Sequence, residues 1–257
     1  PPPTPTQPDG TLDLADIEAA IRSPGNTHYP RTRLVCLENT HNRGAGRIQP
    51  YENLVDICRW AEANHLRRHL DGARLFNAAV ATGIPVDRWA QHFDTVSVCF
   101  SKGLGAPIGY ALAGPADLIH AARRHRKVFG GGMRQVGIIA AGALYALEHH
   151  VARLAEDHAN AKLLADAIRD TDGLTLQPTH VDTNIVIFDV EPAISDAADI
   201  AEKLHAAGVW VLAMGPARIR AVTHLDVTRS QVQEAAEIIR KTVSGQALSK
   251  NAGKTKV

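Results

Sequence analysis

Apolar and polar positions alternate with two different periods along the first half of the chain. Apolar runs typical of strands occur at residues 33–40, 67–73 and 95–101, with a further apolar segment at 108–114. Short helices are predicted between them at residues 51–65, 76–83 and 85–93. Strands that alternate with helices in this way predict an α/β fold with a largely parallel sheet, covered by helices on both faces.

From Pro115 onward the pattern is mainly helical, and after residue 150 it becomes mixed. Helices are predicted at residues 115–129, 133–150, 152–170, 196–207 and 229–243. Strand-like runs occur at residues 174–178, 183–190, 209–213 and 217–225. One helix has an apolar stripe wide enough to predict burial, formed by Val136, Ile139, Ala140, Ala143, Leu144 and Leu147.

These patterns predict the domain organisation. Residues 1–150 form one α/β domain, and residues 151–245 form a smaller α+β domain with its own core. Residues 246–257 show no periodicity and are predicted to be a disordered tail.

Composition and charge exclude several classes of protein. The 257 residues include 28 basic and 27 acidic side chains, so the net charge of +1 lacks the basic excess of a nucleic-acid or membrane-surface binder. The hydrophobic fraction of 45% excludes disorder for the bulk of the chain. The longest uncharged apolar run, Gly137 to Leu147, is too short to span a bilayer. We therefore expect neither nucleic acid nor a membrane as a partner.

The cysteines and histidines of this sequence predict neither a disulfide framework nor a metal site. Three cysteines at unrelated spacings form neither a disulfide framework nor a metal-binding pair. Cys36 and Cys99 stand in apolar strand-like runs, so we expect buried free thiols in a reducing cytoplasm. No two histidines four residues apart are accompanied by an acidic third ligand, so no metal site is predicted.

A lysine and an aspartate at neighbouring strand ends are the candidates for chemistry. Lys102 lies in SKGLGAP, directly after the strand at 95–101, where ligands of open α/β sheets bind. Burial there favours the neutral amine, a Schiff-base nucleophile. Asp71 ends the preceding strand, and such a pair suits pyridoxal phosphate: lysine holds the aldehyde as an imine, and aspartate keeps the pyridine nitrogen protonated. Taken singly, Lys102 is equally a solvated loop lysine or part of an anion nest, and Asp71 is equally a turn residue paired with Arg74.

Five motifs carry a resemblance to a known family. They are LENTHN (37–42), HLDGARLFNAAV (69–80), SVCFSKGLGAPIG (97–109), RKVFGGGMRQ (126–135) and RAVTHLDV (220–227). In this order they resemble the successive motifs of low-specificity L-threonine aldolases, fold-type-I pyridoxal phosphate enzymes of the β-eliminating lyase group. The resemblance extends to about residue 243. It implies that residues 1–150 are the C-terminal part of a large cofactor-binding α/β domain, with a mixed sheet covered by helices, and that a small α+β domain follows.

The resemblance also implies roles for individual residues. Lys102 would bond to the cofactor and Asp71 would pair with its pyridine nitrogen. Arg74 and Arg220 would hold the substrate α-carboxylate, with Arg218, on the same strand face, as the alternative to Arg220.

Three further residues match positions near the substrate or the cofactor. His28 would face the substrate side chain, although a loop histidine explains it equally well. Lys127 and Arg134 would reach the cofactor site of a neighbouring subunit, or are simply basic residues at helix ends.

The implied activity is cleavage of L-threonine or L-allo-threonine, small β-hydroxy-α-amino acids, to glycine and acetaldehyde by a cytoplasmic homodimer or homotetramer. His28, or a water that it orients, is the candidate base for the hydroxyl proton. One alternative is β-elimination from another amino acid on the same scaffold, which the THN and VTHLD motifs disfavour. The other is a catalytically dead fragment with an interface role.

The first residues of the chain bear on the choice between an active enzyme and a catalytically dead fragment. Residues 1–10 lack the apolar segment of a signal peptide, and the chain begins without Met. Residues 1–14 are typical of an interior linker before a helix capped by Asp13 or Asp16, so we expect the N-terminus to be a cut edge. The phosphate-binding segment of the family would lie upstream of it. We therefore expect these 257 residues alone to bind the cofactor weakly and to turn over little threonine, and an N-terminally extended chain to recover both.

Overall fold

A computed structural model describes residue 7, residues 10–22, residue 25 and residues 27–245 of the chain. The predicted tail at 246–257 lies outside these residues. The structure divides into two compact units. The first consists mainly of Thr11–Thr40 and Ile48–Ala152, and the second of Gly10, His41–Arg47 and the described residues from Arg153 onward.

The first unit contains a mixed four-stranded sheet. Its strands are β1 (Leu34–Glu38), β2 (Arg67–Gly72), β3 (Thr95–Cys99) and β4 (Tyr110–Ala113), in the order β1-β2-β3-β4. The first three strands are parallel, whereas β4 returns antiparallel to β3. The register places Glu38, Asp71 and Ser97 side by side in one row across the sheet. The α/β class with a mixed sheet agrees with the prediction.

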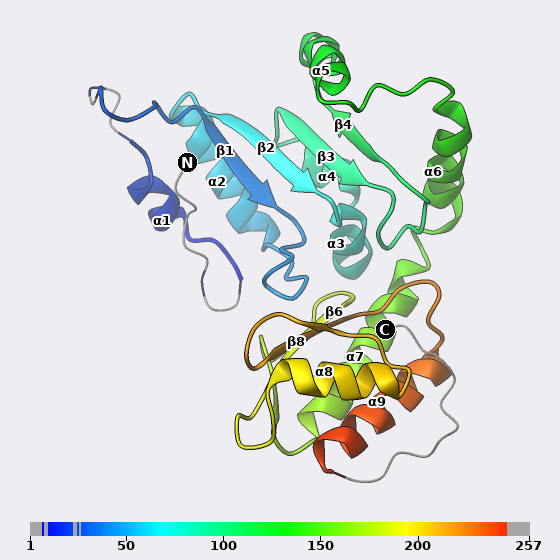
Figure 1. Cartoon of the computed structure of the whole chain (residues 1–257). Coiled ribbons are helices and arrows are strands. Elements are labelled where there is room, and N and C mark those ends of the chain that lie inside the picture. The colour runs from blue at the N-terminus through cyan, green and yellow to red at the C-terminus, as the bar shows by residue number, and fades with distance from the viewer. Residues whose placement is uncertain (1–6, 8–9, 23–24, 26, 246–257) are drawn as a thin grey trace. The chain divides into compact units, whose positions relative to one another are not determined.

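The described part of the first unit also contains six helices. They are α1 (Leu14–Ala19), α2 (Tyr51–Ala63), α3 (Leu75–Thr82), α4 (Val86–Ala90), α5 (Ala116–Val128) and α6 (Gly137–His149). The predicted cap of α1 is present, because the Asp13 side chain accepts a hydrogen bond from the Ala15 backbone N–H at 2.9 Å. Helices α2, α3 and α4 lie on one side of the sheet (Figure 1), where Leu54, Leu70 and Trp89 are among the buried side chains.

The opposite face of the sheet corrects one expectation. Side chains on this face of the strands include Leu34, Asp71 and Leu112, which are exposed. Cys36 is also exposed on this face, and its predicted burial was wrong. The physical reason is the two-residue period of a strand: Val35 and Leu37 point into the core, so Cys36 between them points outward. Cys99 is buried, as expected.

Helix α6 corrects a second expectation. Of its predicted apolar stripe only Ala143 is buried, while Val136 and Leu144 are more than half exposed. An apolar stripe shows which face of a helix can be covered, but no other described element packs over most of this one. None of the helices in the described part of the chain is long and apolar enough to cross a membrane.

The second unit is an antiparallel sheet with helices on one face. Its strands β5 (Leu174–Leu176), β6 (Ile185–Val190), β7 (Leu212–Ala213) and β8 (Arg218–Val222) have the order β5-β6-β8-β7. Its helices are α7 (Leu154–Arg169), α8 (Ala197–Ala206) and α9 (Arg229–Val243). Phe188 and Ile219 lie in the buried core with side chains of these helices. On the other face of the sheet, Ile185, Ile187 and Val222 pack with Ala45 from the loop His41–Arg47.

Candidate active site

Lys102 lies in a tight loop directly after β3 in the first unit. The loop is closed by two backbone hydrogen bonds, from Gly105 N–H to the Lys102 carbonyl at 2.8 Å and from Ala106 N–H to the Phe100 carbonyl at 2.9 Å. Gly105 has φ of 72°, a left-handed conformation that favours glycine. Leu104 is buried and anchors the loop. The Lys102 side chain is consequently half-buried at the carboxyl end of the parallel strands.

Burial lowers the pKa of the Lys102 amine, and the nearby Arg74 guanidinium lowers it further. Three groups act in the opposite direction on this pKa, namely Cys99, Asp71 and Glu38. The net result is a lowered pKa, so at neutral pH more of the amine is in its neutral, nucleophilic form than for an exposed lysine. These interactions also place Lys102 and Asp71 within electrostatic reach of one another.

Asp71 presents its carboxylate on the open face of the sheet. It occupies the penultimate position of β2 and is exposed. Its Oδ1 accepts a hydrogen bond from the Ala73 backbone N–H at 3.1 Å, which fixes the carboxylate at the turn after the strand. The structure therefore brings together Asp71 and Lys102, which the sequence placed at one sheet edge.

Arg74 follows this turn, at the N-cap position of α3. Burial lowers the pKa of its guanidinium, and the neighbouring carboxylates Glu38 and Asp71 partly oppose this shift. Arg74 is therefore a half-buried cation that interacts electrostatically with both the Asp71 carboxylate and the Lys102 amine, and its guanidinium is suited to bind an anion.

Tyr110 belongs to this group of residues, and sequence reasoning missed it. The Lys102 Nζ lies over the Tyr110 ring, 5.6 Å from its centroid. A hydrogen bond with the Cys99 side chain is the main reason that the pKa of Tyr110 rises to about 12. Tyr110 stands opposite Cys99 in the β3–β4 ladder. Only the antiparallel return of β4 brings it to Lys102, and the apolar pattern at 108–114 does not reveal strand direction.

We expect Arg74→Gln to raise the pKa of Lys102, because removing a like charge favours the ammonium form. The pH dependence of Lys102 acylation, followed by peptide mass spectrometry, measures this pKa. Arg67→Gln is the matched control, because Arg67 is exposed and pairs with Asp94 at 3.0 Å. An unchanged or lower Lys102 pKa in Arg74→Gln would contradict an effect of this guanidinium on the amine.

The second unit carries the other two predicted arginines, Arg218 and Arg220, on one face of β8. Arg218 is exposed and makes two hydrogen bonds to the Asp189 carboxylate, at 2.7 and 2.9 Å. The Asp189 hydrogen bonds raise the pKa of Arg218. Arg220 is half-buried, and its Nη2 donates to the Asn42 side-chain oxygen at 3.1 Å. The two arginines therefore differ in the charge of these partners, a carboxylate for Arg218 and a neutral amide for Arg220.

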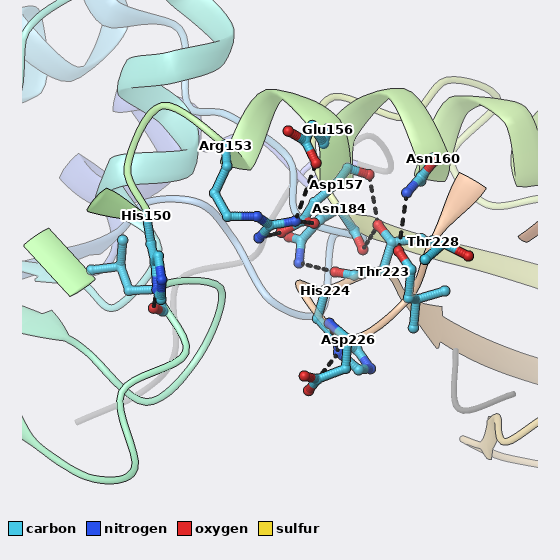
Figure 2. A network of polar contacts seen from close by, with 12 residues as sticks. His150, Arg153, Glu156, Asp157, Asn160, Asn184, Thr223, His224, Asp226 and Thr228 are labelled. Carbon is cyan, nitrogen blue, oxygen red and sulfur yellow. Dashed lines mark hydrogen bonds and ion pairs between the residues drawn. The ribbon is translucent and has the colours of Figure 1, made fainter. Parts of the chain in front are cut away.

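A buried polar network fixes Thr223, the residue that directly follows β8 (Figure 2). The Thr223 hydroxyl donates to the Asp157 backbone carbonyl at 2.7 Å, and the Asn184 amide donates to the Thr223 carbonyl at 2.9 Å. The Asp157 side chain is fully buried and pairs with Arg153 at 2.7 Å. Burial raises the pKa of Asp157 although the Arg153 hydrogen bond opposes this. Helix α7 is thus tied to the segment that directly follows β8.

The remaining predicted residues lie elsewhere in the first unit. His28 is exposed in the turn at residues 27–28. Lys127 is exposed in the last turn of α5, where a cation interacts favourably with the helix dipole. Arg134 is exposed between α5 and α6. Their proposed contacts with substrate or cofactor stay predictions.

The sequence profile of the family described as Beta-eliminating lyase matches residues 1–191 of the chain. The chain belongs to this family. It is 42% identical to low-specificity L-threonine aldolase 1 of Arabidopsis thaliana, over 87% of this chain and 63% of that protein. The resemblance predicted from the motifs is therefore confirmed. The chain spans less than two thirds of the length of this relative.

Solved structures confirm the fold of this β-eliminating lyase family member. The threonine aldolase of Leishmania major superposes with a TM-score of 0.76 at 22% identity, covering 92% of this chain and 69% of that one. An Oryza sativa TDC solved with PLP gives a TM-score of 0.71 at 20% identity, covering 94% of this chain and 55% of the other. These neighbours are fold-type-I pyridoxal phosphate enzymes, the predicted fold class.

The residues around Lys102 fit pyridoxal phosphate chemically. The cofactor needs an amine that is neutral near pH 7 for its aldehyde and a carboxylate for its pyridine nitrogen. Lys102 provides an amine with a lowered pKa, and Asp71 provides an exposed carboxylate within electrostatic reach of it. The donor set of the first unit thus suits this cofactor.

Proposed function

We propose that the chain is part of a pyridoxal phosphate-dependent aldehyde-lyase that cleaves L-threonine and L-allo-threonine to glycine and acetaldehyde. The observation that carries the proposal is the Lys102 amine, whose pKa is lowered beside the Asp71 carboxylate at the carboxyl end of the parallel strands. The similarity to proteins named low-specificity L-threonine aldolase supports the choice of reaction.

The cofactor, when bound, supplies an electron sink for the bond between Cα and Cβ of the amino acid. Lys102 bonds the cofactor aldehyde through Nζ, and its lowered pKa makes the neutral amine available for this. Asp71 holds a proton at the pyridine nitrogen through its carboxylate. An aspartate does this better than a neutral group because the protonated ring nitrogen is cationic.

The substrate α-carboxylate requires cations to bind it, and cleavage requires an acceptor for the β-hydroxyl proton. Arg74 and Arg220 bind the α-carboxylate, for which a planar, permanently charged guanidinium is suited. Arg220 is preferred to Arg218 because Asp189 already occupies the Arg218 guanidinium. Either His28 accepts the β-hydroxyl proton at a ring nitrogen, or it orients a water whose oxygen accepts that proton.

The assembled protein is proposed to be a cytoplasmic homodimer or homotetramer, in which Lys127 and Arg134 reach the cofactor of a neighbouring subunit. Support comes from the apolar side chains around these two residues, of which Phe129 and Ile138 are 85% and 81% exposed. The three cysteines are free thiols, which suits a reducing compartment.

Release of acetaldehyde from L-threonine tests the proposed reaction. We expect the N-terminally extended protein, loaded with pyridoxal phosphate, to form acetaldehyde and glycine in equal amounts, measured by an aldehyde-reducing dehydrogenase assay and by amino-acid analysis. Formation of a keto acid and ammonia instead would identify a β-elimination. Absence of a protein–cofactor absorbance band would identify a chain without catalytic function.

A further inference from the structure

The loop His41–Arg47 follows β1 of the first unit, but it packs within the second unit. The Thr183 hydroxyl donates to the Gly46 carbonyl at 2.9 Å, and Arg47 pairs with Asp182 at 3.0 Å. Ala45 is 2% exposed in the apolar cluster on the sheet. The loop is therefore held by a hydrogen bond, an ion pair and an apolar contact.

The backbone at Gly46 requires glycine for this attachment. Its φ of +71° is left-handed, and a Cβ there would lie 2.5 Å from the Thr183 hydroxyl oxygen. The loop also closes on itself, because His41 N–H donates to the Arg47 carbonyl at 2.8 Å. Asn42 is thus part of a closed loop that is fixed against the sheet of the second unit.

From this position Asn42 reaches the arginine that we assign to substrate binding. Its side-chain oxygen accepts a hydrogen bond from Arg220 Nη2 at 3.1 Å. An amide oxygen directs a guanidinium without adding a negative charge. Arg218, two residues earlier on the same strand face, shows the other arrangement, since Asp189 binds its guanidinium through both carboxylate oxygens.

We propose that Asn42 is a positioning residue: it orients the Arg220 guanidinium for the substrate α-carboxylate and, being neutral, does not compete with that carboxylate for the charge of Arg220. The inference rests on the proposed function, in which Arg220 binds the carboxylate. It predicts that a carboxylate at position 42 pairs with the Arg220 guanidinium, as Asp189 does with Arg218, and weakens binding of the substrate carboxylate.

Asn42→Asp tests the inference because it keeps the size and shape of the side chain and adds only a charge. In the N-terminally extended protein loaded with pyridoxal phosphate, we expect the dissociation constant of glycine, followed through the cofactor absorbance, to rise on the order of tenfold or more. Asn42→Ala, which removes the hydrogen bond alone, should raise it about three- to tenfold. Binding of methylamine, which has the amine but no carboxylate, should not change in either variant.

Two further variants separate positioning from a structural effect. In an Arg220→Gln background, Asn42→Asp should cause no further loss of glycine binding, because Asn42 acts through Arg220. Asp189→Asn is the matched control, which removes the carboxylate from Arg218 and should leave glycine binding unchanged. With L-threonine, Asn42→Asp should raise KM more than it lowers kcat, as expected for an interaction with the bound carboxylate.

The outcomes distinguish failure of the inference from failure of the proposed function. The inference is overturned if Asn42→Asp binds glycine like the wild type, loses glycine and methylamine equally, or weakens glycine binding further in Arg220→Gln. The proposed role of Arg220 is overturned if Arg220→Gln itself binds glycine normally, and the inference falls with it. An N-terminally extended wild-type protein without a cofactor band overturns both.

Discussion

Lys102→Ala is expected to abolish attachment of the cofactor and to lower threonine cleavage by at least roughly 10²–10⁴-fold. Alanine removes the only atom of this side chain that can bond the cofactor aldehyde, and Arg74 and Asp71 have no amine to replace it. Borohydride reduction of the loaded wild-type protein should leave a pyridoxyl mass on the peptide that contains Lys102.

Lys162→Ala provides the control for this experiment, because Lys162 is an exposed lysine of α7. It should retain cofactor attachment and activity. A pyridoxyl label on Lys127 or Lys162 in the wild-type protein would show that the assignment of Lys102 is wrong.

Asp71→Asn is expected to lower turnover by orders of magnitude, roughly 10²–10⁴-fold, while the protein still folds. Asparagine has nearly the same shape and its amide oxygen can still accept the hydrogen bond from the Ala73 N–H, so the turn after β2 is preserved. A neutral amide cannot hold the proton of a pyridinium nitrogen, and the cofactor absorbance should shift accordingly. Activity assays, absorbance spectra and thermal unfolding measure the three effects separately.

Glu38→Gln is the matched control for this charge effect. Glu38 stands next to Asp71 in the row across the sheet, and the substitution also replaces a carboxylate by an amide. Its effect on turnover should be much smaller than that of Asp71→Asn. An active Asp71→Asn protein with an unchanged cofactor spectrum, or equal losses in both variants, would contradict the assigned role.

The elements of both units were predicted from local pattern because the periods of strands and helices are properties of short segments. The proximity of Lys102 and Asp71 was also predicted, since parallel strands end at one edge of their sheet. Tyr110 was missed because its contact depends on strand direction. Cys36 was assigned to the core because an apolar run does not show which alternate side chain faces water.

Arg218 and Arg220 show a different limit of sequence reasoning. They share a strand face and a residue type, so spacing alone leaves both as carboxylate ligands. Their partners Asp189 and Asn42 distinguish the two arginines in the structure, and Asn42 is separated from Arg220 by 178 residues. The THN motif around Asn42 was explained as a strand-end turn, because nothing local indicates that this loop packs on another sheet.

Because the loop His41–Arg47 packs within it, the second unit is not formed by one continuous segment of the chain. The hydrogen bond between Gly46 and Thr183 joins positions 137 residues apart. Forming it therefore costs the chain entropy of bringing two distant segments together. A fragment cut before Arg153 would leave Ile185, Ile187 and Val222 exposed to water on one face of its sheet. Recombination that exchanges the second unit between related proteins must therefore carry this short loop with it, and with the loop it carries the residue that orients Arg220.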